Sequence, residues 1–247
     1  LRRLAHGAII TAAVFAAPAA ALPTGNLLAN PGGEVAPGAE ADGLRGEPAG
    51  WVQHAVIEAG TQGAYDSCYG GSTEERDVLE KSVGEAIGGG ARFFFAAETG
   101  ISDLWQEVTV DPAEADGTRL TIGGEFGGYE DQEDNALLSA TFYDSADAEI
   151  GLIETEPVTA GDRGNLTGFV HREASAILPL GTARIRFVLE QLREDGSDND
   201  SYADNLFATF DATAPAPPAA IGDVTCPVAT PEPPPSGGGG KDRKSRG

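Results

Sequence analysis

The sequence has no methionine, only two cysteines and two tryptophans, and 16 basic residues against 39 acidic ones, which gives a formal net charge of -23. Such a shortage of positive charge argues against nucleic acid or an anionic membrane as the partner, because both are bound through clustered Lys and Arg. The acidic excess fits an extracellular protein kept soluble by its charge, or one that binds cations. Because the chain begins at Leu1 and holds no methionine, its true start stays open.

The two cysteines, Cys68 and Cys226, form no CxxC motif, so neither a thiol-redox centre nor a zinc cluster is expected. In an exported chain the compartment permits disulfides. A bridge between the two residues would pin the C-terminal segment onto the domain, whereas the alternative is two independent thiols. We favour the bridge.

Long apolar runs are missing beyond the start of the chain. Residues 1–21 begin with Arg2 and Arg3, continue with an apolar stretch from residue 8 and end in three alanines, which predicts a secretory signal peptide. This stretch is too short to predict a membrane span. We therefore expect a secreted or extracellular protein, in part associated with the cell surface, that has no integral membrane span.

The C-terminal residues 212–247 are rich in Pro, then in Gly, and end in basic residues, which predicts a disordered tail. Residues 22–211 predict one all-β domain. Short stretches with a period of two, separated by turn residues, indicate nine or ten strands, as in a β-sandwich or jelly roll. The expected strands include residues 26–34, 50–59, 91–98, 104–110, 118–124, 135–144, 150–156 and 165–173.

Particular side chains and segments follow from this pattern. Trp51 is expected in the core, and residues 91–98 are apolar enough for a central strand buried on both faces. The irregular segment 61–90 predicts a short helix near residues 72–82. Residues 183–192 and 201–210 alternate most clearly and are joined by an acidic, turn-rich loop, which predicts a β-hairpin.

Several blocks in order resemble a galactose-binding-like jelly-roll domain of secreted bacterial proteins, the β-sandwich also used by many carbohydrate-binding modules. The blocks are NLLANPGGE (26–34) followed by GW (50–51), QEVTV (106–110), GGEFGGYEDQEDNALLSATFYDSADAEIG (123–151), PVTAGDRGNLTGFV (157–170), ARIRFVLE (183–190) and SDNDSYADNLFATF (197–210). They span residues 26–210. The resemblance implies the fold and, less specifically, a glycan as ligand, because a fold does not determine function.

The resemblance also implies a structural calcium between the first and last strands. Its acidic ligands would be Glu34 and Asp204, although Gly33 stands where the family motif has Phe. Ca²⁺ takes about six to eight hard oxygen ligands, so one carboxylate from each end of the chain would clip the sandwich shut. The alternative is that Glu34 caps a turn and Asp204 bonds backbone amides.

A glycan site needs flat aromatic faces and a few planar hydrogen-bonding groups. The best cluster lies in and just after the predicted loop 125–134, where the family keeps G-G-Y-x-x-Q-x-D. Its candidate ligand-binding residues are Tyr129, Glu130, Gln132, Asp134 and Asn135. The alternative is that the last three only hold a tight bend. Trp105, at a position where the family has a small residue, is expected in the core rather than on a sugar platform.

Catalytic motifs are missing: the sequence has no G-x-S-x-G, no H-E-x-x-H and no phosphate loop. Carboxylates are plentiful, so composition does not exclude a glycosidase pair. We expect a secreted, non-catalytic carbohydrate-binding module with a structural calcium. A structural or adhesive surface protein on the same fold is the alternative, and a glycoside hydrolase is the third hypothesis.

Overall fold

The computed structural model describes residues 22–35, 48–53, 67–68, 79–97 and 100–210. In chain order the elements are β1 (Val52–Gln53), β2 (Ser67–Cys68), α1 (Lys81–Ile87), β3 (Arg92–Ala97), β4 (Ile101–Thr109), α2 (Pro112–Ala115), β5 (Arg119–Gly128), β6 (Asn135–Tyr143), β7 (Glu149–Glu154), β8 (Gly168–Ile177), β9 (Arg184–Leu192) and β10 (Asn199–Phe210). The strands form two five-stranded antiparallel sheets. Sheet I has the order β1-β4-β9-β6-β7, and sheet II has the order β2-β3-β10-β5-β8.

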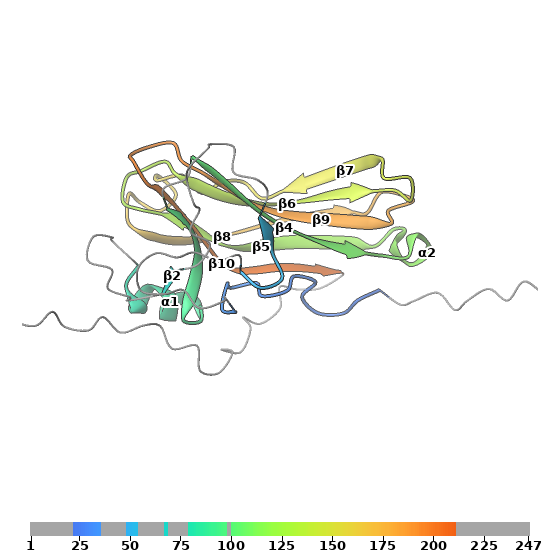
Figure 1. The fold of residues 1–247 in the computed structure, drawn as a ribbon, viewed down its shortest axis with the longest axis horizontal. Coiled ribbons are helices and arrows are strands. Elements are labelled where there is room, and N and C mark those ends of the chain that lie inside the picture. The colour runs from blue at the N-terminus through green and yellow to red at the C-terminus, as the bar shows by residue number, and fades with distance from the viewer. Residues whose placement is uncertain (1–21, 36–47, 54–66, 69–78, 98–99, 211–247) are drawn as a thin grey trace, which may run out of the picture.

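The strand order is that of a jelly roll. From β3 onward the chain crosses between the sheets at each step except from β6 to β7, which gives the orders β4-β9-β6-β7 and β3-β10-β5-β8. β1 and β2 extend one edge of each sheet. Figure 1 shows the two layers lying along each other, with α1 at one end of the sandwich and α2 at the other. The all-β jelly roll expected from the sequence is therefore confirmed.

The core lies between the two sheets and follows the predicted alternation. In β6, Leu138, Ala140 and Phe142 are buried as expected. Trp51 is also buried and packs edge-on against Phe94, with ring centroids 5.6 Å apart. Burial of the apolar surface of such side chains is the main favourable contribution to the free energy of folding.

A second, smaller cluster lies on the outer face of sheet II. Phe93, Phe95 and Tyr202 pack there with Leu79, which precedes α1. Phe94, between the two phenylalanines, faces the main core instead. β3 is therefore buried on both faces, as its uninterrupted apolar sequence predicts.

The hairpin predicted for residues 183–192 and 201–210 is wrong. β9 pairs with β4 and β6, whereas β10 pairs with β3 and β5 in the other sheet. The acidic loop between them passes from sheet I to sheet II at one end of the sandwich, because β9 and β10 are the central strands of their sheets. Alternation shows which side chains are buried, and Ile185, Phe187 and Leu189 are indeed buried. It does not show which strands lie next to each other. In this protein the jelly-roll topology places β9 and β10 in different sheets.

Other element boundaries also differ. Residues 26–34 form no strand; instead the Asn26 side chain donates to the carbonyl of Leu206 (2.9 Å) and accepts from the N–H of Ala208 (3.0 Å). Most of the range of the predicted helix near 72–82 lies outside the described residues; the described part contains α1, which ends at Gly88 with a left-handed φ of 66°. β5 extends to Gly128 and includes the first part of the predicted loop 125–134.

The predicted signal peptide and tail lie outside the described residues, and so does Cys226 of the predicted Cys68–Cys226 pair. None of the helices in the described part of the chain is long and apolar enough to cross a membrane.

Candidate functional site

Asp134 ends the loop between β5 and β6 and is fully buried. Its Oδ1 accepts hydrogen bonds from the N–H groups of Glu194 (2.7 Å) and Asp195 (2.8 Å), and its Oδ2 accepts one from the N–H of Asp200 (2.7 Å). The three donors belong to the loop and strand start after β9. Asp134 therefore ties the β9–β10 loop, which passes from sheet I to sheet II, to the β5–β6 loop. This is a positioning role.

The other four predicted residues are less buried. Tyr129 is half-buried and packs against the second cluster, and Gln132 is also half-buried. Asn135 begins β6, and its Nδ2 donates to the carbonyl of Glu133 at 3.0 Å. Glu130 alone among the five predicted residues is exposed. The structure thus brings these residues into one loop, but with different surroundings.

Arg163 holds this loop to the loop between β7 and β8. Its buried guanidinium donates through Nη1 to the carbonyls of Glu130 (2.9 Å) and Leu166 (2.7 Å), and through Nη2 to that of Gln132 (2.7 Å). Burial lowers the pKa of Arg163. One cation therefore satisfies carbonyls of both loops and sets the distance between them.

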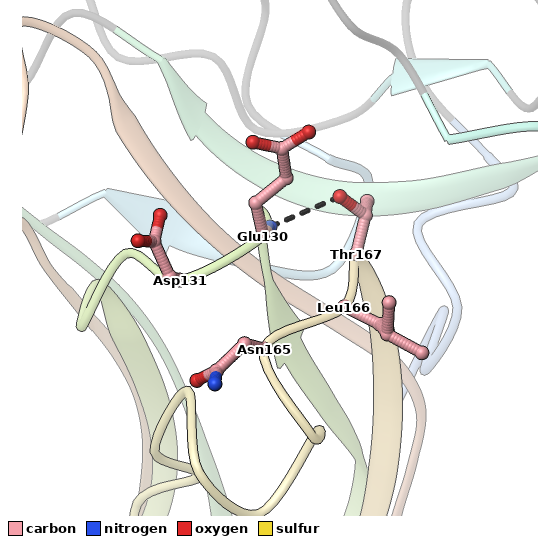
Figure 2. A pocket seen from close by; sticks show the side chains of 5 residues that line it. All are labelled: Glu130, Asp131, Asn165, Leu166 and Thr167. Carbon is pink, nitrogen blue, oxygen red and sulfur yellow. Dashed lines mark hydrogen bonds between the residues drawn. The ribbon is translucent and has the colours of Figure 1, made fainter.

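A pocket of about 460 Å³ opens between the same two loops. It is lined by Glu130, Asp131, Asn165, Leu166 and Thr167. Figure 2 shows Glu130 and Thr167 joined by the hydrogen bond from the Glu130 N–H to Oγ1 of Thr167, which is 3.0 Å long. The sequence predicted only Glu130 of this set. No aromatic side chain is among the lining residues, so the pocket lacks a flat face for a sugar ring.

The outer face of sheet I carries aromatic and basic side chains. Trp105 lies on this face, because both of its neighbours in β4 are buried, and this corrects the expectation that Trp105 is a core residue. The guanidinium carbon of Arg186 lies 4.8 Å from the Trp105 ring centroid and 5.7 Å from that of Tyr143. The guanidinium carbon of Arg184 lies 4.0 Å from the Tyr143 centroid. We call these four residues the platform.

Glu107 binds both arginines of the platform. Its Oε1 accepts from Nε of Arg186 at 2.7 Å and from Nη1 of Arg184. Arg184 also pairs with Asp147 (3.1 Å), whose side chain is 83% exposed and therefore contributes little. Ion pairs and ring contacts together hold the guanidinium groups in place before any ligand binds.

The other end of the same face is acidic. Asp103 in β4 stands directly opposite Glu190 in β9, and Glu154 in β7 lies nearby. Burial, followed by the charges of Asp103 and Glu154, raises the pKa of Glu190 above its ordinary value of 4.5. Like charges directly opposite each other in a sheet are destabilising.

Replacing Glu190 by Gln is therefore expected to raise Tm at pH 7. A carboxyl whose pKa is raised in the folded state favours folding when protonated, so this group's contribution falls as pH rises from about 4.5 through the raised pKa. The gain from Glu190→Gln should shrink as the pH is lowered to 4. Thermal melts at pH 4 and 7 test this, with the exposed Glu156→Gln as control. An equal gain at both pH values would contradict the assignment.

Glu34 and Asp204, the predicted calcium ligands, are both buried. Oε1 of Glu34 accepts from the N–H of Arg92 (2.9 Å), and Oε2 accepts from the N–H of Ala91 (3.0 Å). Oδ1 of Asp204 accepts from the N–H of Asn205 at 2.6 Å. Asp204 thus bonds a backbone amide, as the alternative hypothesis expects, whereas Glu34 bonds amides at the start of β3 instead of capping a turn.

The two carboxylates also lie close to each other, beside Gly32. A Cβ atom added to Gly32 would stand 2.9 Å from Oδ1 of Asp204 and 3.9 Å from Oε1 of Glu34. Within the described ranges no group of three or more His, Cys, Asp or Glu side chains is arranged for a metal. The pair fits a calcium site only if backbone carbonyls and water supply the remaining oxygens.

Comparison with known proteins gives matches in structure alone. No protein-family model matches the chain, and no curated protein matches its sequence. Among solved structures, the enzymatically active domain of bacteriophage CBA120 tailspike protein 4 has a TM-score of 0.45 and 12% identity, over 75% of this chain. The match spans 21% of the tailspike chain.

Two carbohydrate-binding modules also match. TmCBM61, solved in complex with β-1,4-galactotriose, has a TM-score of 0.43 and 15% identity, with 75% of this chain and 98% of that module covered. The CBM22-1 xylan-binding domain of Paenibacillus barcinonensis Xyn10C has a TM-score of 0.38 and 11% identity, with 69% and 91% covered. The fold assignment itself comes from the strand order.

None of the four platform residues was among the predicted site residues, since Trp105 was expected in the core and Tyr143, Arg184 and Arg186 were not considered. The alternation of Arg184 and Arg186 with buried Ile185 and Phe187 places both arginines on one outward face and is visible in the sequence. The missing information was that β4 and β6 flank β9, which brings Trp105 and Tyr143 beside them.

Proposed function

We propose that the chain is a non-catalytic glycan-binding module of an exported protein and that the platform is its principal binding surface. The observation that supports this best is the position of Trp105, which lies half-buried on an outward sheet face beside Arg186 and Tyr143. A sugar ring offers C–H groups to an aromatic face and hydroxyl groups to planar donors. Both kinds of group are present here on a rigid sheet.

In this proposal the β5–β6 loop provides a second contact region. Glu130 contacts the ligand from the pocket, and Tyr129, which follows β5, and Asn135, the first residue of β6, are further candidate contacts. Asp134 and Gln132 act by holding the loop, since the first is buried and the backbone carbonyl of the second is bound by Arg163.

A glycan-array screen of residues 22–211, with calcium present, tests the proposed function. We expect binding to a defined class of neutral or acidic glycans. A blank array from a sample with a cooperative thermal melt would contradict the proposal and favour the structural or adhesive alternative. Release of reducing sugar from a bound glycan would favour the hydrolase hypothesis instead.

We further propose that Glu34 and Asp204 hold a structural calcium. When bound, the ion would supply positive charge between two buried carboxylates that come from opposite ends of the domain. It would thereby tie the N-terminal segment to β10, next to the hydrogen bonds that Asn26 already makes there.

Chelation is expected to lower the stability of the domain. A ligand at about 100 times its Kd contributes about 2.7 kcal/mol, so EDTA should lower Tm by roughly 5–10 °C. Differential scanning calorimetry with calcium or EDTA measures this, and in Glu34→Gln the two melts should coincide. A wild-type melt unchanged by EDTA would contradict the proposed calcium site and would not affect the glycan proposal.

A further inference from the structure

We infer that the platform selects glycans that carry a carboxylate, as uronic acid residues do, and that Arg186 is the residue that recognises it. This inference rests on the proposed function, and it names the chemical class of the ligand. It follows from the hydrogen-bonding capacity of Arg186 and from the charge around it.

Arg186 has donors that the protein does not use. Its Nε and Nη2 both lie 2.7 Å from Oε1 of Glu107, and within the described part of the chain no residue accepts a hydrogen bond from its Nη1. The side chain is 39% exposed. A guanidinium has planar N–H donors on every edge, so the edge formed by Nη1 and Nη2 is open to a ligand. That edge matches the two oxygens of a carboxylate.

The ring contacts make this edge rigid. The guanidinium of Arg186 contacts the rings of Trp105 and Tyr143, and Glu107 fixes the adjacent edge formed by Nε and Nη2. A ligand carboxylate would therefore meet a donor pair that loses little conformational entropy on binding. The same Trp105 ring would stack against the sugar that bears the carboxylate.

Among the described residues three acids lie at the platform, and none of them is hydrogen-bonded to Nη1 of Arg186. The carboxylate of Glu107 is shared by the two guanidinium groups of Arg184 and Arg186, Asp147 pairs with Arg184, and the exposed Glu149 stands opposite Tyr143 in β7. Glu190 lies four residues further along β9, which is about 13 Å at strand spacing. That exceeds the Debye length of about 8 Å at physiological salt, so the acidic end does not cancel the charge of the platform.

The acidic end has a second consequence for the ligand. Asp103 and Glu190 would repel a second carboxylate placed there. The face therefore suits a glycan in which uronic acids are spaced by neutral sugars, rather than one that is acidic at every residue.

The test uses monosaccharide probes, so it does not depend on the glycan backbone. The methyl glycosides of glucose, galactose, glucuronic acid and galacturonic acid are titrated into residues 22–211, and the indole N–H signals are followed by NMR. We expect the Trp105 signal to move with a Kd roughly tenfold lower for at least one uronide than for its neutral counterpart. The Trp51 signal is an internal control, because Trp51 is buried and its Nε1 donates to the carbonyl of Asn30.

Two variants move the preference in opposite directions. Arg186→Gln should abolish the difference between uronide and neutral sugar, whereas Glu107→Gln should enlarge it, since it removes the carboxylate that competes for the same guanidinium. Arg172→Gln is the matched control, because this arginine lies in β8 of sheet II and pairs with Asp162. An unshifted Trp51 signal shows that each variant is folded.

The outcomes separate this inference from the proposed function. Equal affinity for uronide and neutral sugar, unchanged by Arg186→Gln, would overturn the inference while the Trp105 shift still supported glycan binding. A uronide preference that survived Arg186→Gln would also overturn it. If no sugar moved the Trp105 signal and the glycan array were blank, the proposed function itself would fall.

Discussion

Replacing Asp134 by Ala is expected to lower the free energy of unfolding by about 3–4 kcal/mol. The substitution leaves the N–H groups of Glu194, Asp195 and Asp200 without their acceptor, and each hydrogen bond to a carboxylate contributes about 1.5–3 kcal/mol, partly recovered by water. For a domain of this size the Tm should fall by roughly 10 °C. Loss of these bonds would also release the loop that crosses between the sheets.

Urea denaturation of the two proteins measures this difference. Asp134→Asn should be intermediate, because its amide group would face the N–H of Asp200 in place of an acceptor. Asp195→Ala is the control, since among the described residues that exposed side chain accepts one hydrogen bond, from the N–H of Glu133, in the same region. A loss below about 1 kcal/mol for Asp134→Ala would show that the buried carboxylate does not hold the crossing.

Replacing Trp105 by Ala is expected to weaken glycan binding at least about 25-fold. An aromatic residue at the centre of a binding surface typically accounts for about 2 kcal/mol or more, and about 1.4 kcal/mol corresponds to a tenfold change in Kd. The substitution also removes one ring from the guanidinium of Arg186. Because Trp105 lies on the outer face of sheet I, the loss of stability should be much smaller than the loss of affinity.

Isothermal titration calorimetry with the best glycan from the array measures the change. Trp105→Phe should retain part of the affinity, because it keeps a flat ring on the same face. Tyr129→Ala distinguishes the two candidate surfaces. If Tyr129→Ala removed binding and Trp105→Ala left it intact, the β5–β6 loop rather than the platform would be the principal site.

The resemblance to galactose-binding-like domains extends to the fold, whereas the platform is a feature of the side chains of this particular chain. Trp105 stands where a small residue was expected, and it lies beside arginines supplied by β9. Substitution on an outward sheet face changes the ligand-contacting surface while the buried alternation stays the same. This is why glycan specificity can differ among proteins that share one jelly roll.

The sequence by itself determined the fold class and the buried face of most strands. Period-two alternation is a local property, so Leu138, Phe142 and Phe187 could be placed in the core without knowledge of their neighbours. The unbroken apolar run at Phe93, Phe94 and Phe95 likewise predicted a strand covered on both sides.

Only the tertiary structure decided which strands are neighbours, and the candidate site depends on that choice. The predicted hairpin failed because β9 and β10 belong to different sheets. Trp105, Tyr143 and Arg186 meet only because β4 and β6 flank β9, across sequence separations that no local pattern records. In the sequence Asp134 was predicted to bind ligand, because its true hydrogen-bond donors lie about sixty residues away and no local pattern reveals them. Folding brings the loop that carries these donors next to Asp134.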